Sequence, residues 1–423
     1  MTYVVQQPID DGLLLYNTLT CSLVLLTPSE AAEITAQRKL IDSWFLVPQA
    51  HDDRKLCHQV RQMAALLEPA AKAITHYTIL TTTGCNARCF YCFEKGTKPV
   101  TMTAETASKV VRYIVAHRGD EKVKLRWFGG EPLVNVKVID QICTELSNQG
   151  VPFYSTMVSN AYLFDADMVQ RANDQWKLLQ VHVTLDGLPQ TYNHVKAYVY
   201  QNVNAFERVL QSIGLLTAAG IRVLIRLNVD KYNIEEMAQL VSLLHRRFGS
   251  NEQLIVYSHE LFGERSPEDS AALFAKRMQL NQQIAKWGYG GRQRLQKDIK
   301  LNYCIADNDR SVLIAPDGHL GKCEHFIDRE FFGHIDSKER DMAIIRKFKE
   351  RRADSESCAT CPFYPQCYRL VMCEDDFGCT SESQQEHLHN TMASMKYEYE
   401  RYLSNKKKKM KLKFDITIQE VTD

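Results

Sequence analysis

The alternation of strand-like and helix-like segments between residues 77 and 262 constrains the fold of this 423-residue chain more than any other feature. Apolar runs of strand length recur six times, and helical periodicity fills the gaps between them, as at 104–117 and 205–219. Strands separated by helices build βαβ units and a parallel sheet, so an α/β fold is predicted. The carboxyl ends of such strands share one edge, where loops carry the chemistry. The six runs are 78–81, 123–128, 153–158, 178–185, 222–229 and 253–257.

Composition and charge exclude several classes of protein. Hydrophobic residues make up 45% of the chain and charged residues 24%, the profile of a soluble globular protein. The formal net charge of +1 provides no general attraction to nucleic acid or to a membrane. The sequence has no apolar run long enough for a transmembrane helix, and its first residues lack the pattern of a signal peptide. We therefore expect a cytoplasmic protein with no membrane or nucleic-acid partner.

Thirteen cysteines are many for a chain without a secretion signal, in which a disulfide framework is not expected. Ten of them fall in two groups, 85–92 and 304–379, and clustering of this kind indicates metal or cluster ligation. The other three, Cys21, Cys57 and Cys143, stand alone, and we expect them to be small buried hydrophobic residues.

The first group is the run CNARCFYC at residues 85–92, in which Cys85, Cys89 and Cys92 have CxxxCxxC spacing. A structural metal site closes with four ligands, whereas a catalytic site keeps one position open. Iron–sulfur clusters usually take four cysteines. Three thiolates in one loop therefore indicate a 4Fe–4S cluster with one iron free to hold a small molecule. A zinc loop or a set of buried thiols is the alternative.

Further motifs follow the predicted strands in order. The run WFGGEP at 127–132 follows the second strand, Ser159 and Asn160 end the third, and TLDG at 184–187 ends the fourth. Together with the cysteine loop and Tyr91 in it, this order resembles the radical SAM superfamily. The resemblance implies a partial (β/α)6, TIM-like barrel that binds S-adenosylmethionine (SAM) on a 4Fe–4S cluster. In that family an electron from the cluster splits the sulfonium and releases a 5′-deoxyadenosyl radical.

The resemblance also assigns residues to SAM. Gly129, Gly130, Glu131 and Pro132 match the family's GGEP run, which holds the methionine amino group. Glu131 offers an acceptor for an ammonium, and the two glycines allow the backbone to approach a ligand closely. Ser159 and Asn160 match the family's ribose contact, although Ala161 stands where the family often has glycine.

Asp186 lies in TLDG, which resembles the family's SLDG. Lys196 stands where the family carries an arginine, so it is the predicted partner of the SAM carboxylate, without the bidentate fork of arginine. Arg226 and Asn228, at the end of the fifth strand, are predicted polar contacts to the nucleoside. For each of these polar residues, a strand-end or helix-cap hydrogen bond is the alternative.

The second cysteine group resembles a SPASM domain, which binds two auxiliary 4Fe–4S clusters. Cys304 is followed by Gly-x4-Cys, by CxxC, by x5-Cys and by two further cysteines, and the gap of five residues before Cys373 departs from the usual three. By this resemblance the first auxiliary cluster would be bound by Cys304, Cys323 and Cys373, and the second by Cys358, Cys361, Cys367 and Cys379. A pair of structural zinc sites is the alternative.

Seven thiolates face the eight irons of two auxiliary clusters, so one iron is expected to be open or held by another ligand. An open iron could take a substrate thiolate, which favours thioether chemistry. Glu324 follows Cys323 in a stretch that resembles the one in anaerobic sulfatase maturases where an aspartate acts as general base. Glu324 is therefore the candidate catalytic base, and a salt bridge is the alternative reading of it.

The N-terminal residues predict a small α+β module. Two apolar strands surround a polar centre over 13–26, which is a hairpin signal, and a helix is expected to open at the TPSE run, 27–30, with Ser29 as candidate cap. A second helix is expected over 53–67. This pattern resembles small leader-binding modules of the winged-helix type, and a plain cap on the barrel is the alternative. The predicted parts are 1–76 (N-terminal module), 77–290 (partial barrel), 300–380 (SPASM domain) and 381–423 (C-terminal helix and basic tail).

These resemblances imply an oxidoreductase that matures a ribosomally made peptide by a thioether or carbon–carbon cross-link. Its partners would be a peptide or protein substrate with a leader, and an electron donor such as flavodoxin or ferredoxin. An anaerobic sulfatase maturase that forms formylglycine is the alternative within the class. A zinc-stapled binding protein is the alternative from another class.

Overall fold

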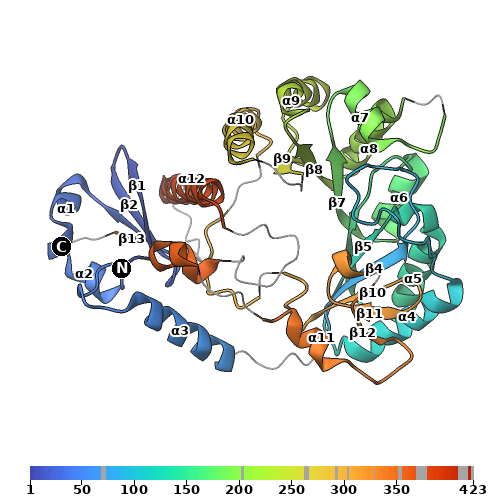
Figure 1. The fold of residues 1–423 in the computed structure, drawn as a ribbon, viewed down its shortest axis with the longest axis horizontal. Helices are drawn as coiled ribbons and strands as arrows, with labels where there is room; N and C mark the ends of the chain where they lie inside the picture. Colours follow the sequence, from blue (N-terminus) through green and yellow to red (C-terminus); the bar gives the residue numbers. More distant parts are fainter. Residues whose placement is uncertain are drawn as a thin grey trace. The chain divides into compact units, whose positions relative to one another are not determined.

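The computed structural model describes residues 1–67, 73–201, 204–261, 266–290, 294–302, 304–327, 329–350, 355–367, 379–407 and 418–420. The chain forms two compact units (Figure 1). The barrel unit comprises Ala71–Gly291 and Cys304–Lys349. The terminal unit comprises Met1–Ala70, Arg292–Tyr303 and Glu350–Asp423. The segment 300–380 is thus divided between the two units, and its status as a separate domain stays a prediction.

The barrel unit is built on a nine-stranded sheet with the order β12-β11-β10-β4-β5-β6-β7-β8-β9. The six central and edge strands β4 to β9 pair in parallel and in sequence order, which confirms the predicted α/β partial barrel. These strands are β4 (His76–Thr82), β5 (Val123–Gly129), β6 (Phe153–Val158), β7 (Leu178–Leu185), β8 (Arg222–Val229) and β9 (Leu254–Glu260).

Helices connect the strands and cover the outer face of the sheet, as Figure 1 shows for α4, α5 and α6. Alternate strand residues, among them Trp127, Val181 and Ile225, are fully buried beneath these helices. Each such side chain contributes about 1.5–3 kcal/mol by leaving water. The intervening residues form the inner face of the sheet. The helices are α4 (Ala104–His117), α5 (Val136–Asn148), α6 (Ala166–Asp174), α7 (Pro189–Lys196), α8 (Ala205–Ala218), α9 (Ile234–Phe248) and α10 (Pro267–Lys286).

Three short strands that the sequence analysis did not predict extend this sheet beyond β4. Strand β10 (Ser311–Ile314) pairs in parallel with β4, and β11 (His319–Gly321) and β12 (Phe331–His334) follow in antiparallel pairing. Gly318, with φ +95°, closes the turn between β10 and β11, a backbone conformation that favours glycine. Strands of three or four residues are too short to show a period-2 pattern. Helix α11 (Met342–Lys347) follows them.

The terminal unit has its own four-stranded sheet, with the order β1-β2-β3-β13. The predicted hairpin is confirmed, because β2 (Gly12–Asn17) and β3 (Ser22–Leu26) pair antiparallel. Strand β1 (Val4–Ile9) pairs with β2, and β13 (Ile418–Glu420) lies parallel to β3. The helices of this unit are α1 (Pro28–Ala32), α2 (Arg38–Asp42), α3 (Asp53–Leu67) and α12 (Ser381–Lys407).

The cap of helix α1 differs from the prediction. Thr27, not Ser29, is the N-cap, because its hydroxyl accepts the backbone N–H of Glu30. The Glu30 carboxylate accepts the backbone N–H of Thr27 in return, at 2.7 Å, which completes a capping box. Pro28 occupies the first turn, where a missing N–H costs nothing, and so the helix begins two residues earlier than Ser29 would allow.

Hydrophobic contacts hold α12 against the sheet of the terminal unit. Met395 and Tyr399 of α12 share a buried cluster with Val5 and Leu14, and the Tyr399 hydroxyl donates to Asp11 at 2.6 Å. The three isolated cysteines, Cys21, Cys57 and Cys143, are buried as predicted.

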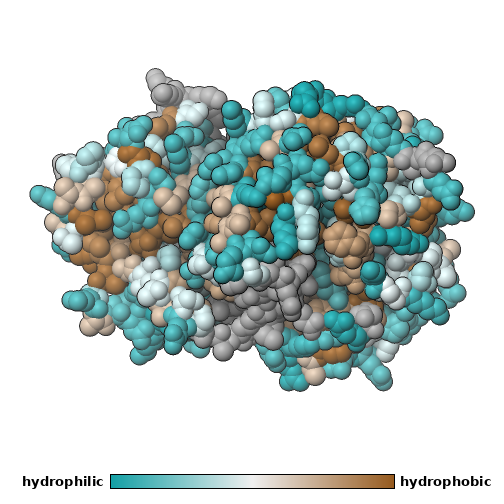
Figure 2. Space-filling model, turned by 45° about the horizontal axis from the view of Figure 1, so that its top comes forward, coloured by the Kyte–Doolittle hydropathy of each residue, from teal (hydrophilic) through white to brown (hydrophobic). Residues whose placement is uncertain are grey.

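The surface is mixed in character. Hydrophilic residues predominate on the face drawn in Figure 2, and hydrophobic residues gather in patches between them. Among the described helices, none combines the length and the hydropathy that a membrane crossing requires.

Candidate active site at the carboxyl ends of the barrel strands

The cysteine loop begins directly after β4 and rests on the glycine pair that ends β5. A Cβ atom on Gly129, whose φ is +121°, would lie 2.1 Å from the carbonyl oxygen of Thr82. A Cβ on Gly130 would lie 2.5 Å from the carbonyl oxygen of Gly84, the residue before Cys85. The glycine pair was predicted to let the backbone approach a ligand closely. In the structure, the backbone at the start of the cysteine loop makes that close approach instead. Backbone bonds from residues 130 and 131 to Thr82 and Gly84, at 3.1 and 3.0 Å, fix that contact.

Glu131, Ser159 and Asn160 come together next to this loop. The Glu131 side chain is completely buried, and it accepts hydrogen bonds from the Ser159 hydroxyl at 2.9 Å and the Asn160 backbone N–H at 2.8 Å. Burial raises the pKa of Glu131 to about 7, against the lowering effect of these donors. A carboxylate has about four acceptor positions, so Glu131 retains capacity for an ammonium group.

Tyr91 of the cysteine loop is anchored to the ends of β7 and β8. Its hydroxyl donates to Asp186 at 2.7 Å and accepts from Lys196 and Asn228, both at 3.0 Å. Asn228 also donates to Asp186, at 2.8 Å. Four residues predicted as SAM contacts thus form one hydrogen-bonded cluster, which ties the loop to strands that lie about a hundred residues further along the chain.

Lys196 is held inside this cluster by an ion pair with Asp186. The Nζ–Oδ2 distance is 3.0 Å, and both side chains are buried. Burial, the largest single influence, disfavours the ammonium, but Asp186, Tyr91, Cys89 and Tyr192 together outweigh it and raise the pKa of Lys196 well above its ordinary value. The structure therefore pairs the Lys196 ammonium with the Asp186 carboxylate. The predicted role of Lys196 as partner of the SAM carboxylate stays a prediction.

The three thiols of the loop are half-buried neighbours. Burial raises the pKa of Cys85 to about 12, and nearby Glu131, Cys89 and Cys92 add to the rise. Burial also raises the pKa of Cys92. Three thiolates and a carboxylate in one place repel one another unless a cation binds them, so this donor set suits an iron cluster.

In the described part of the chain, no three His, Cys, Asp or Glu side chains converge closely enough to hold a single metal ion. A four-iron cluster binds each thiolate through a different iron, so its ligands are spaced more widely than those of one ion. The half-buried loop of Cys85, Cys89 and Cys92 is compatible with that wider spacing.

Two cysteines of the second group lie in the barrel unit. Cys323 follows β11, and the ring of His325 lies 4.3 Å from that of Phe93, which adjoins Cys92. Burial lowers the pKa of Lys322 to about 8, while Asp309, Asp307 and Cys304 act in the opposite direction. Cys304 and Cys323 thus share one neighbourhood. Cys373, the third predicted ligand of that cluster, is outside the described residues.

The other described cysteines of this group lie in the terminal unit. Cys358, Cys361 and Cys367 are half-buried against one hydrophobic cluster, which includes Tyr3 and Tyr364. Burial raises the pKa of Cys361, and Cys379 and Cys358 contribute to the rise. The structure therefore brings the predicted ligands of the second auxiliary cluster close to one another, and their pairing with that cluster stays a prediction.

Glu324 forms an ion pair with Arg126 of β5, with an Nη1–Oε1 distance of 2.9 Å. The salt bridge that the sequence analysis left as an alternative is thus present. The carboxylate side chain is 13% exposed, so it keeps access to solvent or a ligand. Its role as a base stays a prediction.

Glu94 is a polar residue near the site that sequence reasoning missed. It lies two residues after Cys92, its carboxylate is nearly buried, and both of its oxygens lack a hydrogen-bond partner among the described residues. Burial raises the pKa of Glu94 to about 7. A single glutamate after a cysteine loop has no pattern that indicates burial, so no sequence signal was available.

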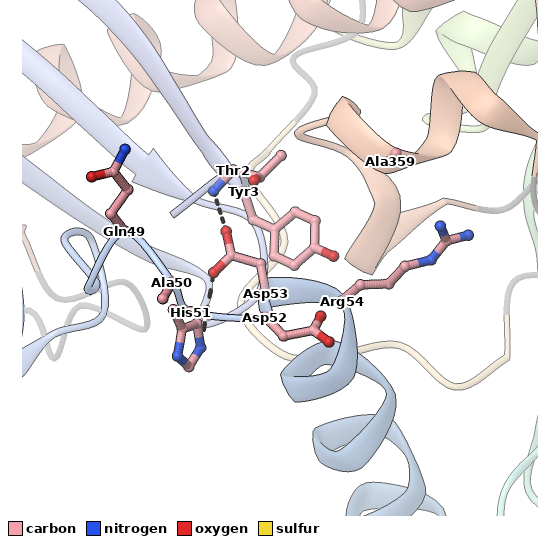
Figure 3. A pocket seen from close by; sticks show the side chains of 9 residues that line it. All are labelled: Thr2, Tyr3, Gln49, Ala50, His51, Asp52, Asp53, Arg54 and Ala359. Carbon is pink, nitrogen blue, oxygen red and sulfur yellow. Dashed lines mark hydrogen bonds and ion pairs between the residues drawn. The ribbon is translucent and has the colours of Figure 1, made fainter.

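Two hollows accompany these residues. One of about 200 Å³ is lined by nine barrel-unit residues, among them Phe90 of the cysteine loop, Asp186 and Tyr232. A larger one, of about 440 Å³, lies in the terminal unit between the start of β1, the N-terminus of α3 and Ala359. Figure 3 shows its polar lining, which includes His51, Asp53 and Arg54 and none of the predicted site residues.

Comparison with known families agrees with this geometry. Residues 79–244, which contain the cysteine loop, the glycine pair and the strand-end cluster, match the family described as the Radical SAM superfamily. The barrel unit thus contains a radical SAM domain. That family implies an enzyme that uses SAM and a 4Fe–4S cluster, and the residues above fit both groups.

Two relatives are distant from this chain in sequence. An uncharacterized protein of Methanocaldococcus jannaschii is 22% identical over 289 residues, which cover 67% of this chain and 94% of the relative. The GTP 3′,8-cyclase of Bradyrhizobium diazoefficiens is 25% identical over 210 residues, 48% of this chain and 57% of that enzyme.

Solved structures extend the similarity of fold beyond the barrel. Native anSMEcpe with bound AdoMet superposes with a TM-score of 0.55 at 15% identity and covers 78% of this chain and 98% of its own. Streptococcus suis SuiB bound to its precursor peptide SuiA superposes with a TM-score of 0.52 at 12% identity, covering 87% of this chain and 94% of its own. At these identities the similarity concerns the fold.

Proposed function

We propose that this protein is a radical SAM maturase with auxiliary clusters, which installs a thioether or carbon–carbon cross-link in a ribosomally made peptide. The observation that carries the proposal is the seating of the cysteine loop on the glycine pair, beside the buried carboxylate of Glu131. The proposed ligands of the catalytic cluster are Cys85, Cys89 and Cys92, with SAM on the open iron.

When bound, the cluster and SAM would provide a 5′-deoxyadenosyl radical for abstraction of a substrate hydrogen atom. The residues of the chain have supporting roles. Glu131 accepts the SAM ammonium through its remaining acceptor capacity, and Ser159 and Asn160 hold that carboxylate in place. The anchor from Tyr91 to Asp186 and Asn228 orients the cysteine loop relative to β7 and β8.

Seven further cysteines support the presence of two auxiliary clusters. We assign Cys304, Cys323 and Cys373 to the first and the remaining four to the second, as the SPASM resemblance implies. A first auxiliary cluster with three thiolates has room for a substrate thiolate, which favours a thioether product. An electron donor such as flavodoxin or ferredoxin would serve the clusters in the cytoplasm.

Peptide binding is supported by the similar structures. Crystals of anSMEcpe hold AdoMet with the Cp18Cys peptide, and crystals of SuiB hold the precursor peptide SuiA. The three-stranded antiparallel β1–β3 sheet with its helices, at the start of this chain, is the proposed leader-binding module. Sheet edges bind extended peptides through backbone hydrogen bonds.

The test begins with protein purified and reconstituted without oxygen. Three clusters predict about twelve irons per chain, and the triple variant C85A/C89A/C92A should retain about eight. The parent should form 5′-deoxyadenosine from SAM with dithionite, and the variant none. Mass spectrometry of a co-expressed neighbouring peptide should show a product that lacks two hydrogens with the parent only. A colourless protein with stoichiometric zinc would support the zinc-stapled alternative and end this proposal.

A second candidate is formylglycine formation, as in a sulfatase maturase. The fold similarity to anSMEcpe and the carboxylate of Glu324 next to Cys323 favour it. The products are distinguishable, because a thioether retains the cysteine sulfur whereas formylglycine made from cysteine loses it. If Glu324 is the base, Glu324→Gln should slow product formation by about a hundredfold while SAM cleavage continues. Unchanged product formation would remove the base assignment.

A further inference from the structure

Three basic side chains lie on the inner face of the barrel. Lys124 and Arg126 come from β5 and Arg226 from β8, and all three alternate with residues buried under the helices. Each is only partly buried, so this face is accessible rather than filled by a packed core. The strand register pairs Arg226 with Tyr257 of β9 and Arg126 with Thr156 of β6, which spreads the charges around one concavity.

The three cations act on the same central groups. The pKa of His182, on β7 between them, is lowered to about 4 by burial and then by Arg126, Lys124 and Arg226. Tyr257 is influenced by Arg226 and Arg126 together, although burial raises its pKa overall. His182 is therefore uncharged at pH 7 and neither adds to nor offsets the charge of these cations. The three cations therefore act on one shared region of the inner face rather than as isolated side chains.

The carboxylates Glu324 and Asp186 already have cationic partners within the protein. Glu324 pairs with Arg126, and Asp186 pairs with Lys196. Among the described residues, Arg226 has no carboxylate within ion-pair distance. One of its terminal nitrogens lies 3.0 Å from His259 Nδ1, and its Nε is buried without a hydrogen-bond partner. The guanidinium thus has unused donors in a planar fork that matches a carboxylate.

We infer that Arg226 binds a carboxylate of the peptide substrate inside the barrel, with Lys124 adding to the positive field. This inference rests on the proposed function, because a peptide is the anion source that the proposal places there. The carboxylate comes either from an acidic side chain or from the C-terminus of the peptide. The acidic group would hold the peptide so that the neighbouring residue meets the radical.

The assignment changes the role of Arg226 from the nucleoside contact predicted by sequence. Its neighbour on the inner face, Asn228, is already bonded to Tyr91 and Asp186 at the strand end. Arg226 lies two residues earlier on β8, deeper in the barrel, and its register partner is Tyr257. A substrate group, rather than the cofactor, would occupy this deeper layer.

Anaerobic calorimetry with three small probes tests the inference on the reconstituted, SAM-loaded protein. N-acetylglutamate α-amide carries a side-chain carboxylate, N-acetylglutamine carries a terminal carboxylate, and N-acetylglutamine α-amide carries none. At least one acidic probe should bind at least tenfold more tightly than the neutral probe, a difference of about 1.4 kcal/mol. The preferred acid identifies the source of the carboxylate, and raised salt should weaken its binding.

Variants locate the binding. Arg226→Met should reduce the affinity for the acidic probe at least tenfold, and Arg226→Lys should restore part of it because the charge remains without the fork. Arg222→Met is the matched control, since Arg222 lies on the same strand with an exposed side chain. It should bind the probe as the parent does. Circular dichroism and iron content establish that each variant folds.

Three results would overturn the inference. The probes could bind equally, the control could lose as much affinity as Arg226→Met, or Arg226→Met could lose SAM affinity alone, which would restore the nucleoside contact. The outcome is separable from that of the proposed function, which depends on 5′-deoxyadenosine formation and requires no probe. Selective binding of an acidic probe without radical formation would refute the proposed function and leave the carboxylate site standing.

Discussion

Replacing Lys196 by methionine should destabilise the barrel unit strongly. The Lys196 Nζ lies 3.0 Å from Asp186 Oδ2, and the side chains are only 3% and 1% exposed. Methionine retains most of the apolar stem but leaves the Asp186 carboxylate buried without its cation. Breaking one side of a buried pair costs about 3–5 kcal/mol. Asp186 keeps hydrogen bonds from Tyr91 and Asn228, so we expect the lower end, about 3 kcal/mol.

The double variant Asp186→Asn/Lys196→Met separates the ion pair from general damage to packing. With both charges removed, no buried charge is left uncompensated. The double variant should therefore be more stable than Lys196→Met alone, with a coupling energy of about 2 kcal/mol in the mutant cycle. Lys137→Met, at an exposed position on α5, is the matched control and should change stability by less than about 0.5 kcal/mol.

The pH dependence follows from the direction of the Lys196 shift. The pKa of Lys196 in the folded protein is raised well above that of the unfolded chain. Its stabilising contribution is then fully present below the unfolded pKa and is lost only as pH rises through the higher folded value. The difference between parent and Lys196→Met should thus be constant between about pH 6 and pH 9.

Anaerobic urea unfolding followed by circular dichroism measures these differences, and peptide-resolved hydrogen exchange locates them at the ends of β7 and β8. Because the chain has two units, the transition that involves the barrel peptides is the one compared. A Lys196→Met protein as stable as the parent would refute the reasoning. So would a double variant whose loss equals the sum of the two single losses.

Three other predictions concern different parts of the chain. Gly129→Ala should lower the free energy of unfolding by about 3 kcal/mol and reduce the iron content, because its Cβ would meet the Thr82 carbonyl. The control Gly150→Ala has open space around its Cβ and should lower the free energy of unfolding by only about 1 kcal/mol, measured by thermal unfolding. The affinity for SAM, measured by calorimetry, should fall about tenfold per pH unit below pH 7, because Glu131, with a pKa of about 7, must lose its proton to accept the ammonium. Glu131→Gln should abolish this pH dependence. Thr27→Ala should destabilise the terminal unit by about 1 kcal/mol through loss of the capping box while Ser29→Ala has almost no effect, and the reverse order would contradict the observed cap.

The main elements of the fold were predictable because their patterns are local. The six parallel strands show apolar runs in sequence order, and the hairpin of β2 and β3 shows two runs around a polar centre. The cap of α1 was misplaced by two residues, because Thr27 and Ser29 both have capping hydroxyls and only the backbone geometry selects one. Strands β10 to β12 escaped prediction because each has only three or four residues.

The sequence by itself determined the class of chemistry and the residues available for it. The relevant patterns are properties of short segments, so they can be recognised from the sequence alone. They are three thiols within eight residues, a glycine pair followed by Glu131, and the alternation of strands and helices. The comparison with the Radical SAM superfamily agrees with that interpretation over residues 79–244.

The tertiary structure alone decided which charges remain available. Lys196 was predicted to meet a ligand but is paired with Asp186, Glu324 is paired with Arg126, and Arg226 has no such partner among the described residues. Arg126 and Glu324 are separated by 198 positions in the chain. Their pairing depends on strand register and on which side of the sheet each residue faces, and a change of one position would reverse that side. Local spacing carries no information about either.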